Sequence, residues 1–316
     1  MVEEFTLTNL TTMSEVTFGQ EVHNDFLIEP NGIDWGSAKA SHNTYTFPGQ
    51  VGTYISSTNV KEREISIKGY AFYILSEEDK ASVNRVDWIE YGYQKILEKK
   101  EVIGNIINPL DYLRIEIGDY YIEGKPTDSV KFGTAEENNN QFFCNFTINL
   151  FCNNPMFRKK SEVQTKLSGS TPKFHFPLVF PQNKGIIFGV RENYRLLAMQ
   201  NDGVATIGCK VRMIARGPIT NPTVRNVTTG ESITINKTLV ADEEVIINTS
   251  DGEYKNVIGI VNGEELNYFK YWDFENQWLK FKPGISIVGY SVDEGDEENL
   301  DVSIEISPQR YILENL

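Results

Sequence analysis

The sequence predicts a mainly β protein: a β-rich α+β N-terminal domain with one helix, followed by a β-sandwich. Short runs that alternate polar and apolar residues fill most of the chain, one segment has helical spacing, and glycine-containing turn signals separate the runs of the second half. The 316 residues exceed the ~100 to 200 residues typical of one domain, so we expect two domains.

Two stretches of the N-terminal half predict half-buried strands. Residues 63 to 69 (REISIKG) alternate strictly. In "NQFFCNFTINLFCNNPMF" the pattern places Phe143, Asn145 and Thr147 on one face. The opposite face then carries Cys144, Phe146, Ile148 and Leu150, and Pro155 ends the strand because proline cannot donate to a ladder.

One helix is predicted, from about residue 76 to 100. Ser76 is a favourable N-cap, and acidic residues 77 to 79 suit the positive end of the helix dipole. The spacing predicts an apolar face made of Val86, Ile89, Tyr93 and Ile96.

The domain boundary is expected at about residue 165, giving domains 1–165 and 166–316. Residues 158 to 185 are rich in Lys, Ser and Gly and hold three prolines, which interrupt any regular period. The extended text from Val22 to Pro48 predicts an arm in the first domain.

The second half predicts an all-β sandwich, because short alternating runs follow one another with turn dipeptides between them. The turn signals include Thr229-Gly230, Asp251-Gly252, Asn262-Gly263 and Pro283-Gly284. The predicted strands are 209–214, 232–235, 244–247, 278–281, 286–288 and 301–306.

Charge and terminal composition argue against two classes of partner. The formal charge of −14 disfavours direct nucleic-acid binding, which depends on clustered Lys and Arg. The N-terminus has acidic residues where a secretory signal needs a basic start, and no stretch reaches ~20 apolar residues. We therefore expect no membrane partner and synthesis in a cytoplasm.

No catalytic, cofactor-binding or metal-binding residue is assigned, and we expect no enzyme. The three histidines, His23, His42 and His175, lie in loop-like or arm-like text without a nucleophile motif. The three cysteines have unrelated spacings and no nearby histidine, which predicts buried free thiols at Cys144, Cys152 and Cys209.

Two acidic clusters offer carboxylates: Asp242-Glu243-Glu244, and "VDEGDEENLD" with residues 293 to 301. Neither matches the calcium-loop pattern, and glycoside hydrolysis needs two carboxyl groups that face each other. A solvated hairpin tip is the preferred interpretation of the first cluster, with calcium binding and hydrolysis left as alternatives.

The aromatic run "LNYFKYWDFENQWLKFKPG" suits sugar stacking, a protein interface or core packing. Tyr268, Lys270 and Trp272 alternate with Phe269, Tyr271 and Asp273, which predicts that at least one set faces the core. A carbohydrate site would use Tyr271, Trp272 or Trp278.

The order of segments resembles a known family. An N-terminal β-domain closes on "FTINLFCNNPMF"; then come "FHFPLVFP", "GPITNPTVRNVTTGESITINKTLVADEEVIINTSDGEYKNV" and "FKPGISIVGYS". This order is similar to the distal tail protein (Dit), or siphophage tail component, family of phages and prophages of Gram-positive bacteria.

The resemblance implies a structural virion protein with a galectin-like sandwich. Six copies would form a homo-hexameric ring at the tail tip, a baseplate hub after assembly in the host cytoplasm. Implied partners are the tail tube protein, a tail-associated fibre or lysin protein and receptor-binding proteins, with no cofactor. An anionic ring would not trap passing DNA. The alternatives are a carbohydrate-binding module for host cell-wall glycan and, third, a glycoside hydrolase.

Overall fold

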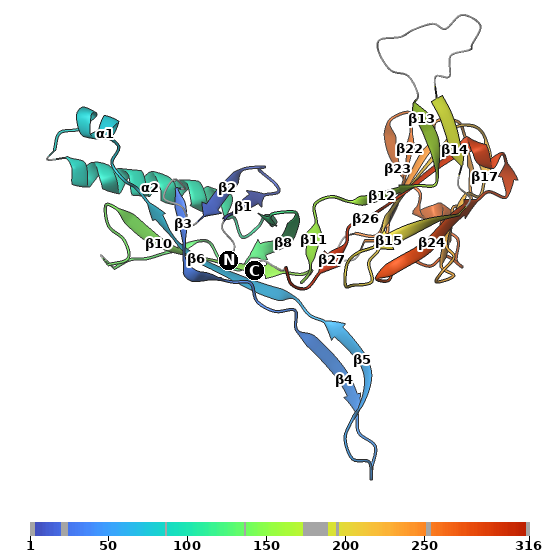
Figure 1. Cartoon of the computed structure of the whole chain (residues 1–316), viewed down its shortest axis with the longest axis horizontal. Helices are drawn as coiled ribbons and strands as arrows, with labels where there is room; N and C mark the ends of the chain where they lie inside the picture. The colour runs from blue at the N-terminus through green and yellow to red at the C-terminus, as the bar shows by residue number, and fades with distance from the viewer. Residues whose placement is uncertain are drawn as a thin grey trace, which may run out of the picture. The chain divides into compact units, whose positions relative to one another are not determined.

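The computed structural model describes residues 4–19, 25–85, 87–135, 137–172, 189–193, 196–250 and 254–313. The chain divides into two compact units, one of Met1–Lys160 with Arg310–Leu316 and one of Ser161–Gln309 (Figure 1). Both are built mainly of strands, so the predicted fold class is confirmed.

The second unit begins at Ser161 and ends at Gln309, whereas the sequence placed the boundary at about residue 165. Two contacts account for this division. Strand β12 (Val163–Lys166) belongs to the second unit because it pairs with β26 (Leu300–Ile306) along four residues. The C-terminal segment belongs to the first unit, where the carbonyl oxygen of Tyr311 accepts a hydrogen bond from Nη2 of Arg63 at 2.6 Å.

The first unit is built on one ten-stranded sheet with the order β27-β11-β8-β7-β1-β2-β3-β6-β10-β9. An additional pairing of β10 with β8 closes this sheet on itself. Its strands are β1 (Glu4–Asn9), β2 (Glu15–Gly19), β3 (Phe26–Asp34), β6 (Arg63–Phe72), β7 (Leu113–Ile117), β8 (Tyr120–Pro126), β9 (Lys131–Phe132), β10 (Phe143–Cys152), β11 (Phe157–Lys159) and β27 (Gln309–Arg310).

The core of the first unit lies inside this closed sheet. Phe18 is fully buried and its ring contacts those of Phe5, Phe26 and Phe146 at centroid distances of 5.1, 5.8 and 5.6 Å. The predicted inward face of β10 is confirmed, since Cys144, Phe146, Ile148 and Leu150 are buried. Gly69 is required on β6, because a Cβ there would lie 2.2 Å from the carbonyl oxygen of Leu27.

The predicted single helix from 76 to 100 is wrong in its extent, because the segment forms two helices. These are α1 (Glu77–Ser82) and α2 (Trp88–Ile106), and Val83 between them adopts an extended conformation. The predicted cap is confirmed: the Ser76 hydroxyl accepts from the Asp79 N–H, and the Asp79 side chain accepts from the Ser76 N–H.

The predicted apolar face of the helix is also wrong in part. Ile96 is buried, but Ile89 and Tyr93 are exposed, and the buried face of α2 consists of Gly92, Ile96, Ile103 and Ile106. In the part of the chain that the structure describes, no helix is long and apolar enough to cross a bilayer.

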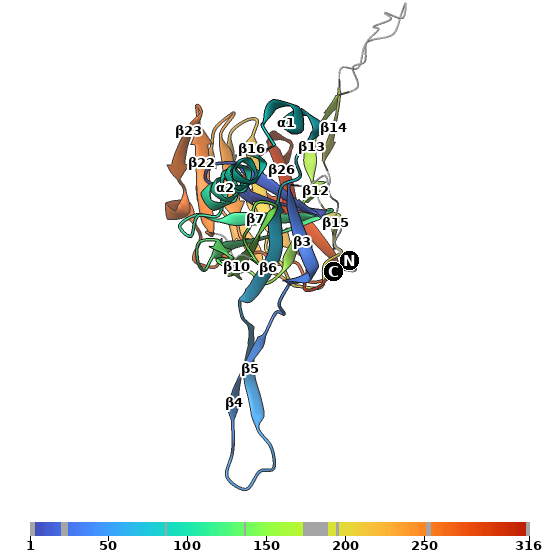
Figure 2. The ribbon, with the colours of Figure 1, turned by 90° about the vertical axis from the view of Figure 1, so that its left-hand side faces the viewer.

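The arm of the first unit is the hairpin of β4 (Ala40–Tyr45) and β5 (Tyr54–Val60), which extends away from the sheet (Figure 2). The sequence placed the arm at Val22 to Pro48. That placement is wrong for Phe26–Asp34, because this segment pairs with β6 inside the main sheet, while residues 20–24 lie outside the described ones.

The second unit contains a six-stranded sheet with the order β12-β26-β16-β21-β22-β23 and a four-stranded sheet with the order β15-β24-β18-β19. Smaller pairings are β20-β17-β25 and β13-β14. The further bounds are β13 (Ser168–Pro172), β14 (Gly189–Asn193), β15 (Leu196–Asn201), β16 (Lys210–Ala215), β17 (Ile219–Thr220), β18 (Thr223–Asn226), β19 (Ser232–Thr234), β20 (Thr238–Leu239), β21 (Glu244–Asn248), β22 (Asn256–Val261), β23 (Glu264–Asn267), β24 (Gly284–Ser291) and β25 (Glu294–Gly295).

Most of the strands predicted for the second half are confirmed, namely those that became β16, β19, β21, β24 and β26. The turn Asn262-Gly263 is confirmed as well, with φ of 51° and 83° at its two residues between β22 and β23. The strand predicted at 278–281 is wrong, because that segment makes only an isolated bridge between Phe281 and Ile207. The predicted turn at Asp251-Gly252 lies outside the described residues, which leave out 251 to 253.

Because each unit has its own core, we expect the two units to unfold independently. Replacing a fully buried phenylalanine by alanine costs about 3 to 5 kcal/mol. We expect Phe18→Ala to lower the melting transition of the first unit and Phe281→Ala that of the second, each leaving the other transition in place. Differential scanning calorimetry checks this, and a single transition that both substitutions lower equally would contradict it.

Candidate functional site

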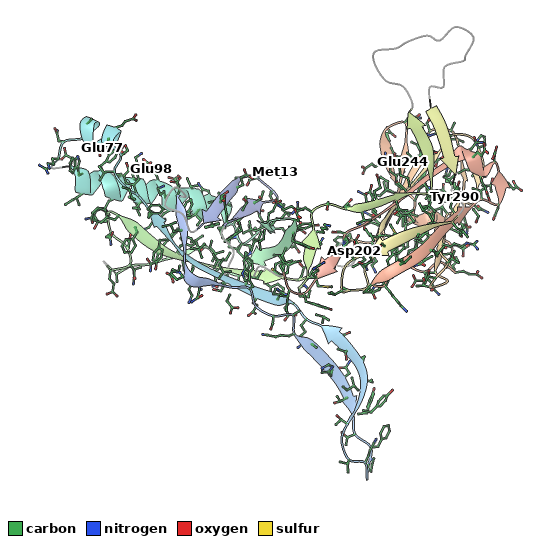
Figure 3. The ribbon with its side chains drawn as sticks, in the orientation of Figure 1. Met13, Glu77, Glu98, Asp202, Glu244 and Tyr290 are labelled. Carbon is green, nitrogen blue, oxygen red and sulfur yellow. The ribbon has the colours of Figure 1, made fainter. Side chains whose placement is uncertain are left out.

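The acidic cluster at residues 242 to 244 follows β20 and ends at Glu244, the first residue of β21. Its three side chains have different environments. Asp242 is exposed, adopts φ of 65°, and lies 3.7 Å from Nη1 of Arg216. Glu244, labelled in Figure 3, pairs with Arg212 on the neighbouring strand β16 at 2.6 Å. The solvated-tip interpretation therefore holds for Asp242 alone.

Glu243 contradicts that interpretation, because only 2% of the residue is exposed. One carboxylate oxygen, Oε1, accepts hydrogen bonds from Nζ of Lys237 and from the hydroxyl of Tyr268, both at 2.6 Å. The other oxygen accepts from the backbone N–H of Val240 at 3.1 Å. Glu243 thus joins the turn before β21 to the segment that follows β23.

The electrostatics of this cluster favour a charged carboxylate. Burial by itself raises the pKa of Glu243, but the hydrogen bonds from Lys237 and Tyr268 outweigh it and leave the pKa below its ordinary value. Burial and the bond to Glu243 raise the pKa of Tyr268, so its hydroxyl stays a donor. A carboxylate with these partners acts as a structural anchor rather than as a proton donor.

The second acidic cluster is brought next to the first by Arg216. Nε of Arg216 lies 2.7 Å from Asp301 at the start of β26, while its Nη1 faces Asp242. Asp293 accepts from Asn221 at 2.9 Å, and Asp296 caps the short helix η2 (Glu297–Asn299). A guanidinium between the clusters differs from the two opposed carboxyl groups that glycoside hydrolysis needs.

The other candidate chemistry lies apart from these clusters. His42 is on the arm, where its Nδ1 is 2.8 Å from the Thr58 hydroxyl, and His23 and His175 lie outside the described residues. Over the described ranges, no three His, Cys, Asp or Glu side chains are placed to hold a metal ion together. The three cysteines are buried and free, as predicted.

The arm is the most exposed element of the first unit, and its apolar residues contact little of the chain itself. Every residue of β5 and nearly every residue of β4 is exposed. An isolated two-stranded hairpin is at best marginally stable in water. Exposed apolar side chains of the hairpin are Tyr45, Phe47, Val51, Tyr54, Ile55 and Val60.

Helix α2 presents a second exposed apolar set in the first unit. Ile89, Tyr93 and Leu97 follow one another at four-residue spacing, which places them on one face of the helix, and Ile89 is 60% exposed. The sequence pattern detected two of these residues but assigned them to the core.

Comparison with known proteins agrees with this picture of an assembly protein. Residues 202–305 match the family model "Siphovirus-type tail component, C-terminal domain". No curated protein matches the chain. Among solved structures, SPP1 Dit (gp 19.1), described as a paradigm of hub adsorption apparatus in Gram-positive infecting phages, is similar over 96% of this chain and 98% of its own, with a TM-score of 0.58 at 13% identity.

A second similar structure comes from the phage P2 baseplate in its activated conformation with Ca. It covers 99% of this chain and 100% of its own, with a TM-score of 0.50 at 15% identity. The domain match defines the class of this protein: it is a structural component of a phage tail. Residues 202–305 thus match a siphovirus-type tail component domain, and the chain as a whole shares its fold with SPP1 Dit.

The buried anchor leads to a stability prediction. Glu243→Ala should lower the free energy of unfolding by about 2 to 3 kcal/mol, because it leaves Lys237 and the Tyr268 hydroxyl without their acceptor. Asp242→Asn is the matched control: it is exposed, Asn tolerates positive φ, and a change within about 0.5 kcal/mol is expected. Chemical denaturation measures both, and equal effects would refute the anchor role.

The same anchor gives a pH dependence. The folded-state pKa of Glu243 lies below its ordinary value of 4.5, so its contribution to stability is fully present above that value and is lost as the pH falls through the folded-state pKa. The stability difference between the parent chain and Glu243→Gln should therefore shrink as the pH is lowered from 6 to the acid range. An unchanged difference across that titration would contradict the assignment.

The thiols give a chemical prediction. Burial raises the pKa of both Cys152 and Cys209 to about 12, so both stay protonated at pH 8 and inaccessible in the native protein. We expect a thiol-specific reagent to label the native chain slowly and all three cysteines at once in denaturant. Rapid native labelling at either position would count against the buried placement.

Proposed function

We propose that this chain is the hub subunit of the distal tail: six copies close into a ring at the tail tip that connects the tail tube to the baseplate or fibre. The observation that carries the proposal is the β4–β5 arm, a two-stranded ribbon with exposed apolar side chains. Such a ribbon gains stability when it lies against another protein surface. A neighbouring copy of the chain supplies that surface in a ring.

A ring requires a heterologous contact, in which one surface meets a different surface on the next copy. The first unit offers two different surfaces of this kind, the arm and the exposed face of α2 with Ile89, Tyr93 and Leu97. In such a contact the arm of one copy binds a different surface of the next copy, so the copy at each end of an open chain still has a free arm or a free surface. Copies therefore continue to add around an axis until the ring closes. The number six is taken from the family resemblance.

The partners in this proposal are the tail tube protein, a tail-associated fibre or lysin protein and receptor-binding proteins. The arm would hold the ring together, leaving the second unit available to these other tail proteins. This role requires no catalytic residue, which agrees with a structural tail component. The completed ring would be part of the virion tail, and its subunits would assemble in the host cytoplasm.

Deleting the arm tests the ring. Residues 42 to 58 are replaced by a two-residue Gly-Gly linker, which leaves the main sheet intact because β3 and β6 pair with each other without the arm. Native mass spectrometry of the parent chain should detect six times the mass of one 36.0 kDa chain, and the deletion variant should be monomeric.

The matched control removes exposed apolar side chains of the second unit, with Leu196→Ser and Ile285→Ser, and should leave the oligomer unchanged. An arm-deleted chain that still forms the same closed oligomer would show that the arm does not hold the ring. A parent chain that stays monomeric alone and with the tail tube protein would overturn the ring itself.

A further inference from the structure

Three aromatic rings in the second unit form a continuous cluster at the surface, which we call the aromatic platform: Phe269, Trp272 and Trp278. The rings of Phe269 and Trp272 are stacked, with centroids 5.7 Å apart and an angle of 3° between their planes. Trp272 and Trp278 contact each other at 4.4 Å, and Phe269 and Trp278 at 6.2 Å. The alternation of residues 268 to 273 predicted that every second side chain faces the core. In the structure only Tyr268 of these six is buried.

The segment that carries Phe269 and Trp272 is attached to the buried residue Glu243 through Tyr268. Tyr268 donates to Glu243 and packs edge-on against Tyr271 at 5.1 Å, and the short helix η1 (Phe269–Tyr271) begins directly after it. The backbone N–H of Trp272 donates to the Phe269 carbonyl at 3.1 Å, and the N–H of Asn236 donates to the Tyr271 carbonyl at 2.8 Å. These contacts hold the backbone that carries Phe269 and Trp272, and the Trp278 ring packs against Trp272. Such preorganisation lowers the entropic cost of binding.

The platform is open to solvent and has unused hydrogen-bonding groups. Phe269 is 47% exposed, and Trp272 and Trp278 are half-buried. Within the described residues, neither tryptophan indole N–H donates a hydrogen bond to a protein acceptor. Glu275 and Gln277, in the loop between the two tryptophans, are exposed, and Asp273 accepts from the Asn236 amide at 2.7 Å.

Charges of both signs lie around the rings. Nζ of Lys255 lies 5.6 Å from the centroid of the Trp278 ring, and that of Lys270 lies 4.9 Å from the Tyr271 ring. Asp273 and Glu275 supply negative charge on the same segment. A strongly anionic polymer would meet both signs, so the surroundings favour a neutral ligand that uses hydroxyl groups as donors and acceptors.

We infer that the aromatic platform binds a neutral pyranose oligosaccharide. The faces of β-linked pyranose rings carry C–H bonds that pack on aromatic rings, while their edges carry hydroxyl groups that suit indole N–H, amide and carboxylate partners. A protein partner that adds a strand is less well matched, because the neighbouring strand edge β23 begins with Glu264 and Glu265, which discourage strand addition. This activity is independent of the ring proposed above.

Tryptophan fluorescence of the full chain tests the site, with chitohexaose, cellohexaose and β-1,4-galactohexaose as probes. At least one of the three should change the emission in a saturable way below 10 mM. Trp272→Ala and the more exposed Phe269→Ala should each weaken that binding at least tenfold, measured by isothermal titration calorimetry, with melting temperatures that confirm folding.

Ile285→Ala is the matched control, since it removes an exposed apolar side chain from β24 in the other main sheet and should leave binding unchanged. Absence of saturable binding to all three oligosaccharides overturns the inference. It is also overturned if folded Phe269→Ala and Trp272→Ala bind the oligosaccharide as the parent does. The same holds if these variants keep oligosaccharide binding and lose only the binding of another tail protein.

Discussion

The pairing of β6 with β10 is the interaction on which the first unit depends. Ten consecutive residues of each strand lie opposite each other, from Arg63 facing Cys152 to Phe72 facing Phe143. Alternation then sends Ile65, Ile67, Cys144, Phe146 and their neighbours to the same interior. Because β10 also meets β8, the same strand closes the sheet around the phenylalanine cluster. A one-residue shift in register would turn these apolar side chains outward.

The arm emerges from this framework, and its position explains how an exposed hairpin is kept in a defined place. Strands β3 and β6 are paired in the main sheet, and the chain between them forms β4 and β5. The root of the hairpin is therefore fixed by a buried pair of strands, while its apolar side chains have no core of their own. A rigid root with an exposed ribbon is suited to contacts between copies of the chain.

In the second unit, a polar interaction has the corresponding organising role. Buried Glu243 joins Lys237, Tyr268 and the backbone of Val240, and in doing so fixes the segment that carries the aromatic platform. A buried carboxylate is costly unless it is fully hydrogen-bonded, and here both oxygens have donors. The acidic trio thus divides into one structural residue, one strand-to-strand ion pair at Glu244 and one exposed residue at Asp242.

The mainly β class, the inward face of β10, the Ser76 cap and the turn at Asn262-Gly263 could be predicted from the sequence. Each depends on alternation, capping or turn chemistry within a few residues. Tertiary structure decided the rest. The exposure of Ile89 and Tyr93, the site of the arm and the burial of Glu243 depend on which distant segment covers a residue. Local pattern cannot reveal this, because the partners of buried Glu243 are set by the fold: Lys237 and Tyr268 lie 6 and 25 residues from it in the sequence.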